Sequence, residues 1–338
     1  MQTIRKEITN QVLLCDSGGR LNPEACGWSS APLHVCNLKG RFPRKKKWDY
    51  WCIMGPRFLF SATVANVDYA GLGDIYFLEY DTRRLAEQIA FRPFSKAPFM
   101  PETVGDSIHF KHRGLDLSFE QTDTGLAMRV RSQRFEGKPL AADIQIERPE
   151  THETLNVVVP WNPRTFQFTS KQQCLPASGT IAWGEESLTF DKDTAYACLD
   201  YGRGIWPYRT AWNWGTFSGR SGADVVGINM GAKWTDGTGM NENGIVLNGK
   251  VHKVFEDIVF EYDEADFMKP WHIRTASSDM VDLTLVPFYE KAAKANLVIL
   301  RARTHQLFGR YSGTLNVDGR TIRIDNILGW AEEHIARW

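Results

Sequence analysis

The chain has 338 residues, 43% of them hydrophobic, and its 40 lysines and arginines balance its 40 aspartates and glutamates. This length allows one large β domain or two of ordinary size, with enough apolar residues to bury a large core. A net charge of zero provides no global field toward nucleic acid or an anionic membrane, so we expect no nucleic-acid partner.

The N-terminal stretch MQTIRKEITNQVLLCDSGG lacks the apolar run of a signal peptide, and no window reaches the length of a membrane span. We therefore expect a cytoplasmic protein without integral membrane association. The six cysteines show no CxxC pair or zinc spacing, so free, buried thiols are expected. The eight histidines form neither HxH nor HExxH, and Gly237-Thr-Gly239 lacks a third glycine. The sequence thus predicts no metal and no cofactor.

One basic run, residues 41–47, precedes the first strong strand signal. We interpret it as a solvated loop or a sheet edge protected by charge. Contact with a phosphate or a lipid headgroup is the alternative.

Period-two alternation dominates from about Trp48 to Ile327, as in Leu115, Leu117 and Phe119. Such alternation is typical of strands with one buried face and one solvent-exposed face. Asn248-Gly249 and Asp318-Gly319 predict two-residue hairpin turns. We expect an all-β protein made of two antiparallel, lipocalin-like barrels or strongly curved sheets packed side by side. A short helix or a turn is expected at 82–90, and short helices are expected at 288–295 and 330–338.

The boundary between the two halves is predicted from prolines, which are poorly tolerated inside central strands. Four of them cluster between residues 148 and 176. We therefore expect an N-terminal β-barrel domain at 1–160, with an N-terminal extension, and a C-terminal β-barrel domain at 161–338 that ends in a short helix.

The segment 200–215 is the strongest indication of a site, because aromatic and charged residues alternate there. It contains Asp200, Tyr201, Arg203, Trp206, Tyr208, Arg209, Trp212, Asn213 and Trp214. Indole and phenol groups need a polar partner, and so do arginines and a carboxylate away from water. The segment predicts the wall of a semi-polar cavity. Trp212 and Trp214 would share one face of a strand, with Asn213 on the other.

Asp200 beside Arg203 or Arg209 is the acid/base candidate. A buried structural ion pair is the alternative interpretation. Glu242, flanked by turn residues, is a second candidate carboxylate or simply part of a turn. In the first half, Trp48 and Tyr50 would share one face of a strand and are further candidates for ligand contact, with Asp49 and Trp51 on the other face.

The order of several motifs resembles a bacterial family of uncharacterised proteins, DUF2804. These motifs are Leu14-Cys-Asp-Ser-Gly-Gly-Arg-Leu-Asn-Pro23, Lys47-Trp-Asp-Tyr-Trp51, Asp68-Tyr-Ala-Gly71, Trp212-Asn-Trp-Gly215, Asn241-Glu-Asn-Gly244 and Gly329-Trp-Ala-Glu-Glu-His334. The resemblance runs nearly end to end. It implies a relation to the double-barrel calycins, which include carotenoid 1,2-hydratases, tocopherol cyclases and fungal Diels–Alderases.

That resemblance implies two β-barrels with an apolar ligand site in or between them. It does not imply which reaction, if any, the protein catalyses, because proteins that share a fold can differ in function. In carotenoid hydratases an aspartate lies two residues before the Asn-Trp-Gly motif, and here that position is Ala211. The acid of that chemistry is therefore missing at the expected place.

We expect a protein that holds a lipid, isoprenoid or aromatic metabolite without a cofactor, either as a binder or as an isomerase, hydratase or cyclase. A carbohydrate-binding or glycoside-cleaving protein using Asp200 and Glu242 is one alternative, because tryptophans and paired carboxylates also serve sugars. A non-catalytic module whose aromatics form only core is the other.

Overall fold

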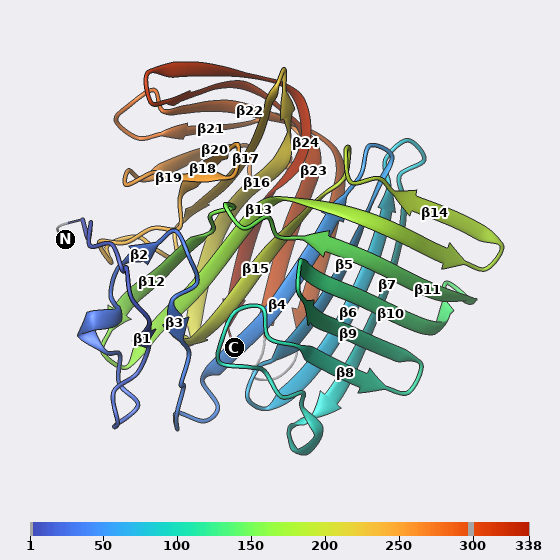
Figure 1. The fold of residues 1–338 in the computed structure, drawn as a ribbon, viewed down its shortest axis with the longest axis horizontal. Coiled ribbons are helices and arrows are strands. Elements are labelled where there is room, and N and C mark those ends of the chain that lie inside the picture. Colours follow the sequence, from blue (N-terminus) through green and yellow to red (C-terminus); the bar gives the residue numbers. More distant parts are fainter. Residues whose placement is uncertain (1–2, 297–300, 338) are drawn as a thin grey trace.

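The fold is built almost entirely from antiparallel strands (Figure 1). The computed structural model describes residues 3–296 and 301–337. Two short 3-10 helices, η1 (Pro23–Ala25) and η2 (Phe94–Lys96), are the only helices in these ranges. None of the described helices has the length or apolarity needed to cross a membrane.

The first large sheet has 13 strands and follows the path β7-β6-β5-β4-β15-β13-β11-β10-β9-β8, with β2, β12 and β14 paired off this path. The end strand β7 approaches the other end of the path, where Gln88 accepts a hydrogen bond from Ser132 on β10 and donates one to the backbone oxygen of Gly114, between β8 and β9. The sheet therefore closes into a nearly complete barrel. Its strands are β2 (Trp28–Ser29), β4 (Lys45–Met54), β5 (Phe58–Asn66), β6 (Ala70–Glu79), β7 (Arg84–Pro93), β8 (Ile108–His112), β9 (Leu115–Thr122), β10 (Gly125–Phe135), β11 (Lys138–Glu147), β12 (Leu155–Asn162), β13 (Thr165–Trp183), β14 (Glu186–Phe190) and β15 (Tyr196–Ile205).

The second large sheet has nine strands in the order β19-β18-β17-β16-β24-β23-β22-β21-β20 and forms a half-barrel. It lies beside β13, β15 and β4 of the first barrel (Figure 1). Its strands are β16 (Arg209–Ser221), β17 (Asp224–Ala232), β18 (Gly244–Leu247), β19 (Lys250–Lys253), β20 (Ile258–Glu261), β21 (Trp271–Thr275), β22 (Val281–Asn296), β23 (Arg301–Val317) and β24 (Arg320–Arg337). A separate two-stranded sheet pairs β1 (Val12–Leu13) with β3 (His34–Val35).

Alternation divides the apolar residues among three places. One face of the first sheet encloses a core that includes Trp51, Phe60 and Phe168. The concave face of the second sheet encloses another around Trp271 and Phe217. The remaining faces of the two sheets pack against each other through two further aromatic clusters. The space between the sheets therefore has its own lining, distinct from either barrel core.

Both predicted hairpin turns are confirmed. Asn248 and Gly249 have φ values of 50° and 79°, and Asp318 and Gly319 have values of 50° and 74°. These are the left-handed conformations that a two-residue turn between twisted strands requires. The expectation of free thiols is also met, since all six cysteines are free.

The three predicted helices are wrong. Residues 84–93 form β7, the segment 288–295 lies within β22, and residues 330–337 belong to β24. In each case cross-strand pairing along a whole neighbouring strand outweighs the weak local preference for helix. The predicted terminal helix of the C-terminal domain is thus the last strand of the half-barrel.

The chain changes sheet between β15, which ends at Ile205, and β16, which begins at Arg209. The predicted boundary at 160/161 falls within the strands of the first sheet, where Pro160 and Pro176 are both in paired positions. The basic run also differs from expectation. Lys45–Lys47 lie in β4, a central strand between β5 and β15, and Lys46 is fully buried. Its ammonium donates to the backbone oxygens of Pro43 and Val67.

Candidate functional site

A cavity of about 410 Å³ lies between the two sheets. Strands β4, β5, β6, β13 and β15 supply one wall, and β16, β22, β23 and β24 supply the other, together with a loop between β17 and β18. Its lining is Trp48, Tyr50, Thr63, Ala65, Val67, Leu72, Asp74, Tyr76, Gln167, Thr169, Lys171, Asp200, Trp206, Trp212, Trp214, Trp234, Glu242, Lys291, Ala293, Thr304, Gln306, Glu332 and His334.

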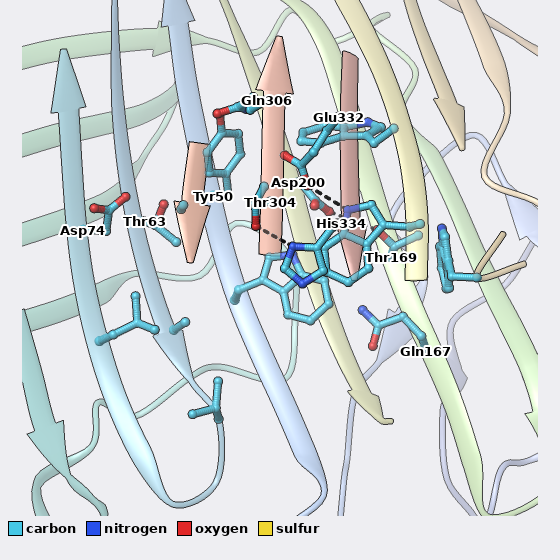
Figure 2. A pocket seen from close by; sticks show the side chains of 18 of the residues that line it. Tyr50, Thr63, Asp74, Gln167, Thr169, Asp200, Thr304, Gln306, Glu332 and His334 are labelled. Carbon is cyan, nitrogen blue, oxygen red and sulfur yellow. Dashed lines mark hydrogen bonds between the residues drawn. The ribbon is translucent and has the colours of Figure 1, made fainter. Parts of the chain in front are cut away.

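The lining follows the period of two along each strand. On β24, for example, Glu332 and His334 face the cavity, whereas Glu333 bonds to Tyr262 on the other side of the sheet. Figure 2 shows Asp74 and Thr63 projecting from one sheet, and Glu332 and His334 from the other. The two walls therefore present polar groups to one shared space.

Five indoles form much of the apolar wall, and several have their N–H groups occupied. Trp206 donates to Gln167 Oε1 at 2.7 Å, Trp214 donates to Asn229 Oδ1 at 2.8 Å, and Trp234 donates to Glu242 Oε1 at 3.0 Å. These bonds fix the ring planes and leave flat apolar faces toward the cavity.

A charged cluster lies on this wall, centred on Lys171 of β13. The Lys171 ammonium is 2.9 Å from Asp200 Oδ1 and 3.1 Å from Glu242 Oε2. Burial by itself would lower the pKa of Lys171, but attraction to Asp200 and Glu242 outweighs burial and raises it. Burial raises the pKa of Glu242 despite the lysine. Thr169 donates a further hydrogen bond to Asp200 at 3.3 Å. The lysine is therefore held as a cation among buried acceptors.

Glu332 is a further buried carboxyl group, and it has no cation in contact among the described residues. Trp212 donates its indole N–H to Glu332 Oε1 at 2.8 Å. Burial raises the pKa of Glu332 to about 7, partly offset by the Trp212 bond. A carboxyl group tuned in this way exchanges a proton readily near neutral pH.

His334 lies next to this carboxyl group on the same face of β24. Its ring stacks on Trp212, with centroids 3.7 Å apart, and its Nδ1 is 2.7 Å from Thr304 Oγ1. Burial lowers the pKa of His334 to about 3, so the ring is neutral. Its Nε2 is buried and has no hydrogen-bond partner in the described part of the chain.

Asp74 supplies another carboxyl group with a raised pKa, on the opposite wall. Burial raises the pKa of Asp74 to about 7, with Lys291 opposing the shift, and its Oδ1 has no hydrogen-bond partner within residues 3–296 and 301–337. Tyr50 and Tyr76 share a hydrogen bond of 2.6 Å between their hydroxyls, and Tyr76 also reaches Gln306 of β23 at 3.5 Å. The cavity thus combines apolar walls with several buried groups able to bond a ligand.

A family model for DUF2804, a domain of unknown function, matches residues 5–338. The chain belongs to the DUF2804 family. No curated protein matches the sequence.

Several solved structures are similar to this DUF2804 protein at low sequence identity. A protein from Nitrosomonas europaea, provisionally named AttH, has 11% identity and a TM-score of 0.50 over 91% of this chain and 99% of its own. CghA with Sch210972 has 11% identity and a TM-score of 0.49, and the match covers 99% of this chain and 96% of CghA. Kievitone hydratase from Nectria haematococca has 9% identity and a TM-score of 0.47, and the match covers 90% of this chain and 94% of the hydratase. The expected all-β fold of two lipocalin-like barrels or strongly curved sheets is confirmed, with one sheet a nearly closed barrel and the other a half-barrel.

Seven of the predicted site residues meet at the cavity, although they come from both sheets and from a loop. They are Trp48, Tyr50, Asp200, Trp206, Trp212, Trp214 and Glu242. The predicted contact of Asp200 with an arginine is wrong, because its cation partner is Lys171.

Three other predicted residues face the barrel cores. Arg203 lies three positions after Asp200 on β15 and so points to the opposite face, where it donates to Asp49 at 2.7 Å. Tyr201 lies in that same core, with Arg203 stacked on its ring at 3.8 Å. Asn213 turns toward the second sheet's interior, where it donates to Tyr262 at 3.2 Å.

Arg209 and Tyr208 lie outside the cavity. Both are exposed, at the connection between the two sheets. Tyr208 stacks on Arg44, whose guanidinium carbon is 5.7 Å from the ring centroid. The separation follows from the chain path, because residues 206–208 form the passage from one sheet to the other.

Several lining residues were missed although a signal for them was present. Gln167, Thr169 and Lys171 alternate with Phe166 and Phe168 on β13, in a stretch that the prolines marked as a boundary. Glu332 and His334 lie in a segment expected to be helical, and a helix would have placed them differently. A strand assignment for the last residues would have put both on one face.

Proposed function

We propose that the cavity binds a largely apolar small molecule, of the lipid, isoprenoid or aromatic class, with one polar end. The observation that carries this proposal is the composition of the wall: indoles from both sheets surround about 410 Å³, and one charged cluster interrupts them. Burial of apolar ligand surface contributes roughly 25 cal/mol per Å². The few polar groups then fix orientation, with the Lys171 cluster accepting or donating bonds at the polar end.

The proposal includes proton transfer to the bound molecule, with Glu332 as the acid. The protonated carboxyl gives its proton to an electron-rich carbon or oxygen of the ligand, and the resulting carboxylate takes a proton back later in the reaction. No electrons leave the ligand and no cofactor is needed. This chemistry fits an isomerase, a hydratase using water, or a cyclase.

The arrangement favours this function over glycoside cleavage. Asp200 and Glu242 are the natural pair for that reaction, and the Lys171 ammonium lies between them. The ammonium contacts both carboxyl groups, and it therefore occupies the space that a glycosidic oxygen would need between them.

Native mass spectrometry of the protein purified from its host tests binding, because a trapped molecule reveals its chemical class. Quenching of tryptophan fluorescence by a panel of lipids and isoprenoids gives the affinity. The variant Thr63→Trp fills the cavity from β5 and is expected to abolish quenching, whereas Val286→Trp, at an exposed position on β22, is not. Equal binding by both variants, or no binder in the panel, contradicts the proposal.

Proton transfer is tested separately with a binder in D₂O. Deuterium uptake into that molecule is expected with the wild-type protein and is expected to fall by at least about a hundredfold in Glu332→Gln. Uptake that is unchanged in the variant rules out Glu332 as the acid and leaves the binding proposal intact.

A further inference from the structure

Four exposed phenylalanines gather at one end of the first barrel, around the turn between β5 and β6. Phe42, Phe91, Phe94 and Phe99 are 61%, 64%, 60% and 80% exposed. The rings of Phe42 and Phe94 are 5.4 Å apart, although the two residues come from different segments. We call these four residues the phenylalanine patch. Proteins seldom leave several large rings in water without a partner for them.

Backbone contacts hold these rings in place. Phe94 begins η2, directly after Pro93. Phe99 follows Pro98, whose carbonyl accepts a hydrogen bond of 3.0 Å from Asn66 at the end of β5. The loop is thus fastened to the body of the barrel while its rings point outward. A fixed loop loses little conformational entropy when its rings become buried.

One ring of the phenylalanine patch lies next to the lining of the cavity. Phe91 pairs directly with Leu72 across β7 and β6, and residues paired in this way share a face of the sheet. Leu72 lines the cavity and is partly exposed, as is Val67 at the start of the same turn. Phe91 therefore lies on the cavity-facing side of this sheet, next to a partly exposed lining residue.

Charge around the phenylalanine patch is positive. Segments 38–48 and 88–101 contain no aspartate or glutamate, and they carry Lys39, Arg41 and Lys96 at exposed positions. The nearby Asp68, in the β5–β6 turn, is buried and paired with Lys45 at 3.0 Å. Two exposed acidic residues flank the second segment: Glu87, which pairs with Lys291, and Glu102. The excess of cations is therefore local to the two segments that carry the rings.

We infer that the phenylalanine patch docks on the surface of a lipid bilayer that contains anionic headgroups. Aromatic rings enter the boundary between headgroups and acyl chains, and lysines and arginines near the surface each add attraction to anionic lipid. Docking in this orientation brings the Leu72 edge of the cavity lining toward the headgroups. The inference identifies a partner surface and does not depend on the ligand or on any reaction.

Vesicle co-sedimentation of the full-length protein tests docking. We expect the wild-type protein to sediment with vesicles of phosphatidylcholine plus phosphatidylglycerol, weakly with phosphatidylcholine alone, and less as salt rises. The triple variant F42S/F94S/F99S is expected to bind at least about tenfold more weakly. The charge variant K39E/R41E/K96E should lose the preference for phosphatidylglycerol. Val286→Ser, which removes an exposed apolar side chain elsewhere, is the matched control and should bind as wild type does.

Absence of sedimentation by the wild-type protein with either vesicle overturns the inference, and so does an equal loss in Val286→Ser. A concentration-dependent dimer that disappears in the triple variant points to a second copy of the chain instead. If circular dichroism shows that the triple variant is unfolded, the test depends on the charge variant. An unchanged preference of that variant for phosphatidylglycerol then contradicts the inference. Quenching of tryptophan fluorescence by a soluble ligand should remain unchanged in both variants, so that docking and ligand binding fail independently.

Discussion

Lys171 Nζ lies between Asp200 Oδ1, at 2.9 Å, and Glu242 Oε2, at 3.1 Å, so one ammonium joins the two halves of the protein. Asp200 belongs to the first sheet, and Glu242 belongs to a loop of the second half. The pairing therefore fixes how the two halves meet and also sets the charge on one wall of the cavity.

Replacement of this lysine should be strongly destabilising. Lys171→Met leaves two buried carboxyl groups without their cation, and we expect the free energy of unfolding to fall by about 3–5 kcal/mol, measured in urea. Lys171→Met combined with Glu242→Gln should recover part of this loss. A single variant within about 1 kcal/mol of wild type would show that the cluster is solvated.

The other buried ion pair should affect stability without affecting binding. Arg203→Met leaves Asp49 uncompensated inside the first barrel and should also cost about 3–5 kcal/mol. Because Arg203 faces away from the cavity, the affinity of the folded fraction for a quenching ligand should match that of wild type. A weaker affinity of the fully folded Arg203→Met variant for the quenching ligand would show that Arg203 contributes to the binding site.

Glu332 should make stability depend on pH. Its pKa rises from an ordinary value of 4.5 to about 7 on folding. Between these values the folded state keeps a proton that the unfolded state releases, so stability falls as pH rises through this window and levels off above it. Glu332→Gln removes this penalty, and the variant should gain on the order of 1–3 kcal/mol relative to wild type at pH 8, with little gain near pH 4. Thermal denaturation of both proteins across this range checks the prediction. A constant difference at every pH contradicts it.

The indole of Trp212 should tune that same carboxyl group. Its N–H bond favours the charged form of Glu332, since the bond lowers the pKa. Trp212→Phe removes the donor and keeps an aromatic ring against His334, so the pKa of Glu332 should rise by roughly one unit. Carbon NMR of labelled glutamate carboxyls measures it directly. Trp214→Phe removes an indole that bonds Asn229 instead and serves as the control.

Much of the fold could be predicted from the sequence because strand pattern and turn chemistry are local. Alternation such as Leu115, Leu117 and Phe119 reports which side of a strand is buried, and Asn248-Gly249 selects its turn without help from the rest of the chain. The same logic placed Trp212 and Trp214 together, with Asn213 opposite. It failed at residues 330–337, where pairing of β24 with both β16 and β23 determines the structure.

The sequence by itself determined the class of fold, the two hairpins and the aromatic character of one segment, because these depend on neighbours within a few residues. Only the tertiary structure decided that the cavity lies between the sheets, that Lys171 rather than an arginine pairs with Asp200, and that Glu332 and His334 reach the same space. Contacts of this kind join residues far apart in the chain, and their free energy depends on how two sheets pack, which no local pattern encodes.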